Sequence, residues 1–423
     1  MFGQLKRFFY FPVASYFRFF AAIRLRRWNP RIILVTGSNG KTTLLHMLEA
    51  QIGDKAKYSH HANSSFGIPF DILDLHRDSL FSSEWIDLIL KAPFMSLKRP
   101  PKEKMYVIEA DCDRPGEGRF LAEFLQPEIV LWTSTARTHS MNFDQLVSFG
   151  RFNNVEEAIA YEYGYFLQYC SKMAVVDGDS QLEMKQVIRT KASVKEIKKE
   201  DLQKYDVIKT GTIFQIKNTR HSFDALLPEE VYLAIAMCKE AVSYLNISFD
   251  TSFAKFILPP GRGSLFAGVK NTTLIDSSYN ANFSSMKAIL EMYKKFPSKV
   301  KWAVIGDMLE QGNEEAEEHK KLATLLAEYD FDRIIFLGPR VTKYTYPTLQ
   351  SLITDKISMN AFLNPREVLE FINAHIQGEE VILFKGARFM EGIIEHLLKD
   401  KKDTLRLPRR EKVWQLRRKQ WSL

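Results

Sequence analysis

The sequence predicts an α/β protein in which a parallel-sheet domain is followed by a smaller Rossmann-like α/β domain. Short β-branched runs such as "RIILVTG" and "MYVIEA" alternate with helical patterns from Arg31 to about Ile247. Such alternation is typical of parallel strands joined by crossover helices. The segment Phe256–Ser264, "FILPPGRGS", interrupts the pattern with two prolines and two glycines. Alternation then resumes, in "KWAVIGD" and "EVILFKG", to about Asp400.

Composition places the chain among ordinary globular proteins. It has 423 residues, of which 45% are hydrophobic and 26% charged, so it can form two or three domains with real cores. We expect an arm over residues 1–30, a first domain over 31–255, a second over 256–400 and a basic tail over 401–423. The three cysteines are far apart in sequence, which argues against a disulfide framework or a zinc ribbon and for a cytoplasmic location.

The net charge of +8 is concentrated at the two ends of the chain. Residues 1–31 contain seven Lys or Arg and no acid, and residues 400–423 contain nine against three acids. The ends together carry +13, so the body between them carries −5.

The apolar stretch "FFYFPVASYFRFFAAI" follows the first cations of the basic amino end. Pro12 and Arg18 interrupt it, so it is too short and too charged to span a membrane. It also lacks a signal-peptide cleavage site. Two interpretations stay open: contact of residues 1–31 with the inner face of an anionic membrane, and a helix packed on the body. Nucleic acid is a weaker partner because no recognition motif accompanies the charge.

The first predicted strand runs into a glycine-rich turn and then a helix, the pattern of a P-loop that grips ATP. Gly37 and Gly40 let the backbone amides approach phosphate oxygens at a helix amino end. Lys41 is expected to reach the β/γ-phosphates and Thr42 to offer its hydroxyl to Mg²⁺. Val35 occupies the first glycine position of the consensus, so a turn without phosphate is the alternative. The predicted nucleotide-binding residues here are Gly37, Ser38, Asn39, Gly40, Lys41, Thr42 and Thr43.

This turn and six further motifs resemble the Mur ligase family. The P-loop spelling "TGSNGKTT" is followed in the family's order by "NSSFGIP", "YVIEADCDRPGEGRFL" and "PEIVLWTSTARTHSMNF". In the second half, "LIDSSYNANFSSM", "AVIGDMLEQG" and "LFKGAR" resemble signatures of the branch that adds D-alanyl-D-alanine. The resemblance covers nearly the whole chain.

The resemblance implies ATP-dependent peptide-bond formation in cell-wall peptide assembly. A muropeptide carboxylate would be activated as an acyl phosphate, and D-alanyl-D-alanine or a similar amine would displace the phosphate. By position, Lys41, Glu109 and His139 would be catalytic, with Thr42, Glu109 and His139 holding Mg²⁺. Without the family, Glu109 would be interpreted as a helix-capping or loop carboxylate and His139 as a structural polar residue.

The same resemblance assigns contacts in the second domain and in one loop of the first. It implies nucleotide contacts by Arg262, Asp276, Tyr279, Asn280 and Asn282. It implies substrate contacts by Asn63, Ser64, Lys385 and Arg388.

The chain departs from the family pattern in several places. Tyr163 stands where many members have a carbamylated lysine, and a phenol is a poor substitute for a carbamate. Glu162 or another acid would then supply the charge, only one metal would bind tightly, or activity would be reduced. Leu233 stands where a nucleotide-side asparagine is usual, and Ser277 and Phe283 are milder changes.

Only thirty residues precede the P-loop, whereas typical members have a UDP-binding domain there. We therefore expect UDP recognition from elsewhere, or a lipid-linked substrate. Two alternatives to a D-alanyl-D-alanine-adding ligase remain. One is the lipid-linked muropeptide-amidating type, whose four-cysteine zinc insertion is absent here. The other is a nucleotide-binding pseudo-ligase that acts as a scaffold.

Overall fold

The computed structural model describes residues 2–60, 62–77, 82–353, 357–387 and 389–421. The chain divides into two compact units. The first comprises residues 1–136, 142–201 and 233–256, and the second comprises 137–141, 202–232 and 257–423. The domain boundaries expected at 30/31, 255/256 and 400/401 stay predictions.

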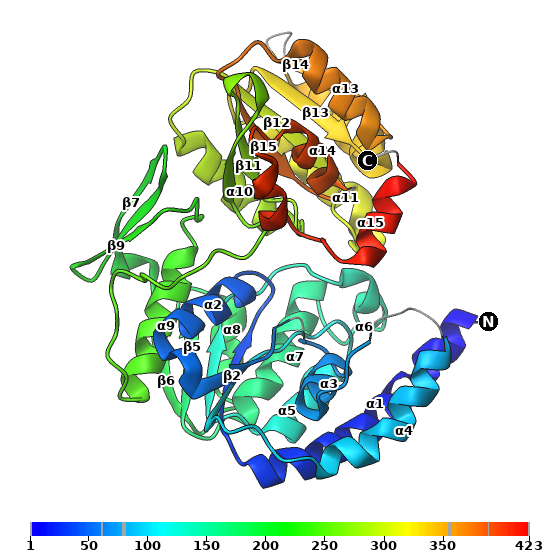
Figure 1. The fold of residues 1–423 in the computed structure, drawn as a ribbon, viewed down its shortest axis with the longest axis vertical. Coiled ribbons are helices and arrows are strands. Elements are labelled where there is room, and N and C mark those ends of the chain that lie inside the picture. Colours follow the sequence, from blue (N-terminus) through cyan, green and yellow to red (C-terminus); the bar gives the residue numbers. More distant parts are fainter. Residues whose placement is uncertain (1, 61, 78–81, 354–356, 388, 422–423) are drawn as a thin grey trace. The chain divides into compact units, whose positions relative to one another are not determined.

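The first unit is built around a parallel sheet (Figure 1). Its strands are β1 (Arg31–Thr36), β2 (Ala56–Tyr58), β3 (Met105–Glu109), β4 (Ile129–Trp132), β5 (Met173–Asp177) and β6 (Ser193–Ile197). They lie in the order β2-β3-β1-β4-β5-β6, and every neighbouring pair is parallel. Ile33, Leu34 and Val35 are fully buried, as expected for a central strand covered on both faces.

Helices connect and cover these strands. They are α1 (Phe2–Trp28), α2 (Lys41–Ile52), α3 (Gly67–Leu73), α4 (Ser82–Leu97), α5 (Glu117–Leu125), α6 (Asp144–Ser148), α7 (Val155–Gln168), α8 (Gln181–Val187) and α9 (Val231–Tyr244). In a parallel sheet the carboxyl ends of all strands meet at one edge, which is where such sheets bind ligands. The P-loop therefore shares its edge with the residues that follow β3 and β4.

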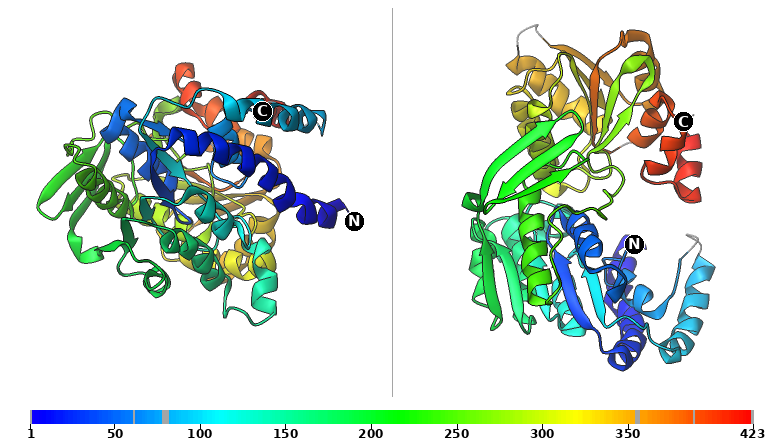
Figure 2. Two further views of the ribbon diagram at one scale, coloured as in Figure 1. Left: turned by 90° about the horizontal axis from the view of Figure 1, so that it is seen from below. Right: turned by 60° about the vertical axis from the view of Figure 1, so that its left-hand side comes forward.

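Helix α1 is an integral part of the first unit. Ala14, Phe17 and Ala21 are completely buried and belong to the main core cluster, while α3 and α4 pack against the helix (Figure 2). The interpretation of this segment as a helix packed on the body is therefore correct. Within the described part of the chain, no helix is long and apolar enough to cross a bilayer.

The second unit contains a mixed sheet in the order β10-β11-β15-β12-β13-β14. Its strands are β10 (Ser264–Ala267), β11 (Thr273–Asp276), β12 (Lys301–Gly306), β13 (Arg333–Leu337), β14 (Ser358–Phe362) and β15 (Val381–Lys385). Only the edge pair β10–β11 is antiparallel among the described strands of this sheet. The helices are α10 (Phe283–Lys295), α11 (Glu315–Leu326), α12 (Tyr346–Leu352), α13 (Pro365–His375), α14 (Met390–Leu397) and α15 (Lys412–Lys419). The predicted α/β fold class is confirmed in both units.

Residues 202–223 differ from the alternating pattern predicted up to Ile247. They form an antiparallel meander of β7 (Leu202–Ile208), β8 (Gly211–Ile216) and β9 (Thr219–Phe223). The links between these strands are two residues long, too short for a crossover helix. Lys217 and Asn218 both have positive φ, at 42° and 64°, which suits a tight hairpin turn.

Candidate active site

The turn between β1 and α2 requires glycine at position 37. Gly37 has a φ of +124°, and a Cβ there would lie 2.5 Å from Oγ1 of Thr133 and 2.8 Å from the amide nitrogen of Ser134. No other residue fits both the backbone angle and the space. The turn thus lies directly against the segment that follows β4.

Hydrogen bonds from that segment hold the turn in place. Oγ1 of Thr133 donates to the carbonyl of Asn39 at 2.6 Å. The Ser38 amide donates to the Ser134 carbonyl at 2.9 Å, and the Asn39 amide to Oγ of Ser134 at 2.9 Å. The shape of the loop is therefore fixed before any ligand binds.

No N-cap side chain bonds the backbone amides at the amino end of α2. Gly40 occupies the N-cap position with a φ of 84° and provides no side-chain cap. Uncapped amides at a helix amino end favour an anion through their N–H groups and through the helix dipole. This is the arrangement that the sequence predicted for a phosphate site.

Lys41 is buried and paired with Asp111, an acid that was not among the predicted site residues. Its Nζ lies 2.7 Å from Oδ2 of Asp111 and donates to the carbonyl of Gly37. Burial by itself would lower the pKa of Lys41, but the charges of Asp111 and Glu109 outweigh it, so the pKa is raised. Lys41 therefore stays a cation at neutral pH.

Thr42 and Glu109, both predicted to hold Mg²⁺, are brought together by the fold. Oγ1 of Thr42 donates to Oε2 of Glu109 at 2.8 Å. The Glu109 amide donates to Oγ of Ser59 at 2.9 Å, which fixes the end of β3. A hydroxyl and a carboxylate are oxygen ligands of the kind Mg²⁺ prefers. The pair fits this ion, although its role stays a prediction.

His139 lies in the short segment 137–141, which groups with the second unit. Its Nδ1 is 2.5 Å from Oε2 of Glu310, within the motif "GDMLEQG". The structure therefore gives His139 a carboxylate partner that the sequence did not predict. Its assignment as a metal ligand also stays a prediction.

Tyr163 points its hydroxyl at the acid that binds Lys41. The hydroxyl donates to Oδ1 of Asp111 at 2.8 Å, and the Tyr163 side chain is completely buried. Burial, with the charge of Asp111, raises the pKa of Tyr163 well above its ordinary value. The phenol is therefore a permanent hydrogen-bond donor here.

Glu162, the other acid considered for the charge of the missing carbamate, is bonded to backbone amides. Its two oxygens accept the amides of Gly116 and Gly118, at 2.8 and 3.0 Å, at the amino end of α5. Asp111 is the acid that lies beside Tyr163. The alternative of "another acid", left open by the sequence, thus has a specific candidate.

The predicted substrate loop around Asn63 and Ser64 adjoins Asp111. The Asn63 carbonyl accepts the Asp111 amide at 2.8 Å, while Oγ of Ser64 accepts the Gly67 amide at 3.1 Å near the start of α3. Ser64 thus has a local structural role. Both substrate assignments stay predictions.

Glu117, which was not among the predicted site residues, bonds several segments of this region. Its carboxylate accepts the amides of Ser65 and Asp113, at 2.8 and 3.0 Å, and the hydroxyl of Tyr10 at 3.0 Å. It thereby connects α1, the loop before α3 and the loop after β3. The glutamate of the "PGEG" motif was the available signal, but its partners are distant in sequence.

In the second unit, the predicted residues cluster at the carboxyl ends of β11 and β15. Oδ1 of Asp276 accepts the amide and the hydroxyl of Ser278, at 3.0 and 2.6 Å. Its Oδ2 is buried without a hydrogen-bond partner among the described residues. Burial raises the pKa of Asp276 to about 6.

Lys385, at the end of β15, donates to the Asn280 carbonyl at 2.6 Å. Burial, with the nearby charge of Arg262, lowers the pKa of Lys385 to about 7. The Arg262 guanidinium lies 4.2 Å from the centre of the Tyr279 ring. Arg388, also predicted to contact substrate, lies outside the described residues.

Asn282 and Arg409 shape the loop between β11 and α10, which carries the motif "SSYNAN" and which we call the signature loop. Asn282 caps α10, and its Oδ1 accepts the Ser285 amide at 2.8 Å. Arg409, from the predicted basic tail, donates to the Tyr279 carbonyl at 2.7 Å and pairs with Glu391 at 3.2 Å. The tail therefore braces the loop, which no local pattern in the tail could have indicated.

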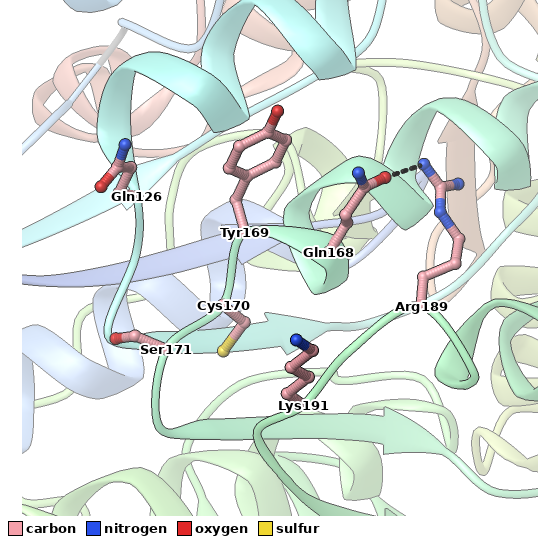
Figure 3. Close-up of a pocket in the computed structure, with 7 residues that line it drawn as sticks. All are labelled: Gln126, Gln168, Tyr169, Cys170, Ser171, Arg189 and Lys191. Atoms are coloured by element: carbon pink, nitrogen blue, oxygen red, sulfur yellow. Dashed lines mark hydrogen bonds between the residues drawn. The ribbon is translucent and has the colours of Figure 1, made fainter.

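A separate hollow of about 690 Å³ lies at the end of the first sheet where the strands begin, opposite to the P-loop (Figure 3). Gln126, Ser171 and Lys191 line it, and each precedes a strand, namely β4, β5 and β6. The P-loop instead follows the carboxyl end of β1. The hollow is therefore distinct from the candidate active site.

Comparison with known proteins decides the family. The pattern of the Mur ligase middle domain matches residues 35–228, and that of the Mur ligase, glutamate ligase domain matches residues 261–388. The chain belongs to the Mur ligase family. Both the family and the class of ligase expected from the motifs are confirmed.

Two relatives of this chain share one name, as follows. The UDP-N-acetylmuramoyl-tripeptide--D-alanyl-D-alanine ligase of Rickettsia prowazekii is 34% identical over 135 residues, 32% of this chain and 29% of that protein. The ligase of that name from Bacillus subtilis is 23% identical over 386 residues, 89% of this chain and 77% of that protein. The MurF ligase of Thermotoga maritima, solved with ADP, superimposes with a TM-score of 0.69 at 21% identity. That match covers 93% of this chain and 84% of the other, and it supports the fold.

At two positions, Leu233 and Tyr163, the chain departs from the pattern of the family. Leu233 is buried in α9, which agrees with an apolar packing position where the family pattern has a polar one. Tyr163 is buried as well and is bonded to Asp111. Both substitutions therefore have structural partners in this chain.

Proposed function

We propose that this Mur ligase joins an amine to a muropeptide carboxylate, using ATP and Mg²⁺ and passing through an acyl phosphate. D-alanyl-D-alanine, named in the relatives, is the proposed amine. The observation that carries the proposal is the contact of Thr42 with Glu109 directly beside Lys41 and the open end of α2. The Lys41 ammonium, the Glu109 carboxylate and the amides of α2 thus lie together where the triphosphate is proposed to bind.

The residues of this chain have distinct parts in the proposed reaction. The amides at the amino end of α2 and the Lys41 ammonium bind the β- and γ-phosphates. Thr42 and Glu109 hold Mg²⁺, which when bound neutralises charge on the phosphoryl oxygens. Fixed charges of this kind stabilise the transition state because they need no reorganisation during the reaction.

We further propose that Asp111 provides the anionic oxygen that a carbamylated lysine provides in other members. In the structure Asp111 neutralises Lys41, and Tyr163 orients its other oxygen. When Lys41 turns to a phosphate, Asp111 retains the Tyr163 bond and exposes one carboxylate oxygen to the site. The contact between Asp111 and the Asn63 loop supports a place near the substrate.

The test is phosphate release from ATP in the presence of a muropeptide and D-alanyl-D-alanine. Turnover that Lys41→Ala abolishes, and that Lys191→Ala at the opposite edge leaves unchanged, would support the ligase. ATP binding without release of phosphate, with any muropeptide, would favour the pseudo-ligase instead. Replacing D-alanyl-D-alanine by ammonia tests the amidating alternative.

We also propose that the enzyme works in the cytoplasm at the inner face of a membrane, with residues 1–31 near the lipid. Arg26 and Arg27 of α1 are exposed, which supports contact with anionic lipid. However, α1 buries its main apolar stripe in the core. The apolar part of a membrane contact must therefore come from another element.

A further inference from the structure

Helix α4 exposes a continuous apolar face. Ile86, Leu90, Phe94 and Leu97 are 64%, 64%, 75% and 69% exposed, and Ile89 is 37% exposed. Their spacing of three and four residues puts them on one side of the helix. We refer to these five residues as the α4 stripe.

The opposite side of α4 is anchored to the first unit. Leu88 and Ala92 are buried in the core cluster that also holds Phe17 of α1. The hydroxyl of Tyr16 donates to the Ile89 carbonyl at 2.8 Å. The α4 stripe is thus the outer face of a fixed helix, and Figure 2 shows α4 alongside α1 in both views.

Cations are concentrated in the segment that follows α4 and at the end of α1. Arg27 donates to the carbonyls of Ser96 and Lys98, at 3.0 and 3.2 Å, so the end of α1 meets the end of α4. The exposed basic side chains on these two segments form a group that we call the basic collar: Arg26, Arg27, Lys98, Arg99, Lys102 and Lys104. Within 98–104 the single acid is Glu103.

This pairing of surfaces has the chemistry of an interfacial membrane helix. Soluble monomers seldom expose large contiguous apolar patches, so a stripe of this size marks an interaction site. Apolar and aromatic side chains on one face, with Lys and Arg beside them, suit the boundary between headgroups and acyl chains. The cations favour an anionic surface over a second copy of this chain, which would bring its own collar.

We propose that the α4 stripe and the basic collar form a peripheral membrane-binding surface for anionic phospholipids. Helix α4 lies in the plane of the interface with its stripe among the acyl chains, and the collar binds the headgroup phosphates. The surface acts whether or not the ligase reaction proceeds. Only its consequence, access to a lipid-linked muropeptide, rests on the proposed function.

A fluorescent label on α4 reports insertion directly. The three native cysteines are buried, so a Phe94→Cys variant takes an environment-sensitive dye at position 94. With vesicles that contain phosphatidylglycerol we expect a blue shift of the dye emission and co-sedimentation of the protein. With pure phosphatidylcholine we expect neither. Binding to phosphatidylglycerol should be lost as the salt concentration is raised. The dye on an Ile188→Cys variant is the control, because Ile188 is 89% exposed far along the chain on the segment after α8.

Charge substitutions separate the two parts of the surface. We expect the double variant Leu90→Glu, Phe94→Glu to lower the bound fraction at least tenfold. Lys98→Glu, Arg99→Glu should remove the preference for phosphatidylglycerol, and Ile188→Glu should bind like the wild type. All of these side chains are exposed, so thermal unfolding should be unchanged. Because binding is measured without turnover, a failed ligase assay leaves this result intact.

Three outcomes would overturn the proposal. The wild type could fail to bind phosphatidylglycerol vesicles, or the α4 double variant could bind as well as the wild type. Light scattering could instead reveal a dimer that the α4 double variant dissociates, which would make a second copy the occupant of the stripe.

Discussion

The hydroxyl of Tyr163 donates a hydrogen bond to Oδ1 of Asp111, the carboxylate whose other oxygen lies 2.7 Å from Nζ of Lys41. The three side chains come from α7, from the residue pair after β3 and from the start of α2. Tyr163, which stands where many members of the family have a carbamylated lysine, thus holds the acid that pairs with Lys41, the lysine proposed to bind phosphate.

Tyr163→Phe removes the hydroxyl and leaves Asp111 with one partner fewer in a buried place. We expect the free energy of unfolding to fall by about 1–3 kcal/mol. Urea denaturation measures it, with Tyr165→Phe, at a half-buried tyrosine of the same helix, as control. Unchanged stability together with unchanged turnover would show that the bond has no role.

Lys41 and Asp111 should be energetically coupled. Lys41→Met alone leaves a buried carboxylate without its cation, and Asp111→Asn alone leaves a buried cation; each should cost about 3–5 kcal/mol of unfolding free energy. The double variant removes both charges, so its loss should be smaller than the sum of the single losses. Additive losses in the double-mutant cycle would contradict the ion pair.

Glu109→Gln keeps an acceptor for Thr42 but removes the negative charge proposed for Mg²⁺. We expect the Mg²⁺ concentration for half-maximal phosphate release to rise by about 10–100-fold. Glu128→Gln is the control, since Glu128 pairs with Arg31 at the other end of the strands. An unaltered Mg²⁺ titration would place the ion elsewhere.

Gly37→Ala should abolish ATP binding, because its Cβ would collide with Thr133 at a backbone angle that alanine avoids. Gly53→Ala is a matched control: Gly53 also has a positive φ, at +60°, but its Cβ would meet nothing within 4 Å. We expect Gly53→Ala to keep its ATP affinity while losing some stability. Calorimetric titration with ATP distinguishes them, and equal affinity of both variants would refute the close approach.

Asp276 should make stability depend on pH. Its folded pKa of about 6 lies above the ordinary value of 3.8, so between these values the folded state keeps a proton that the unfolded state has lost. The unfolding free energy should therefore fall as pH rises from about 4 to about 6, by about 3 kcal/mol, and then level off. Denaturation curves from pH 4 to pH 7.5 measure this, and Asp276→Asn should remove the slope. The same slope in the variant would assign the titration to another group.

Much of the candidate site could be predicted because its residues follow strands in one sheet. Gly37, Lys41 and Thr42 belong to a contiguous turn, and Glu109 ends the neighbouring strand, so parallel pairing alone brings Thr42 to Glu109. The departure at Tyr163 was also visible in the sequence. Its partner was not, because Asp111 is 52 residues away and no periodicity connects them.

Local chemistry thus determined the alternation of strands and helices, the glycine turn and the family motifs, since each depends on near neighbours along the chain. Packing decided which distant groups meet: Tyr163 with Asp111, Glu117 with three separate segments, and Arg409 with the signature loop. It also decided which face of α4 stays outside, because only the assembled core shows that Leu88 and Ala92 are buried while Leu90 and Phe94 remain largely exposed. Burial and long-range contact are properties of the folded chain, and they give these side chains their partners and their proposed roles.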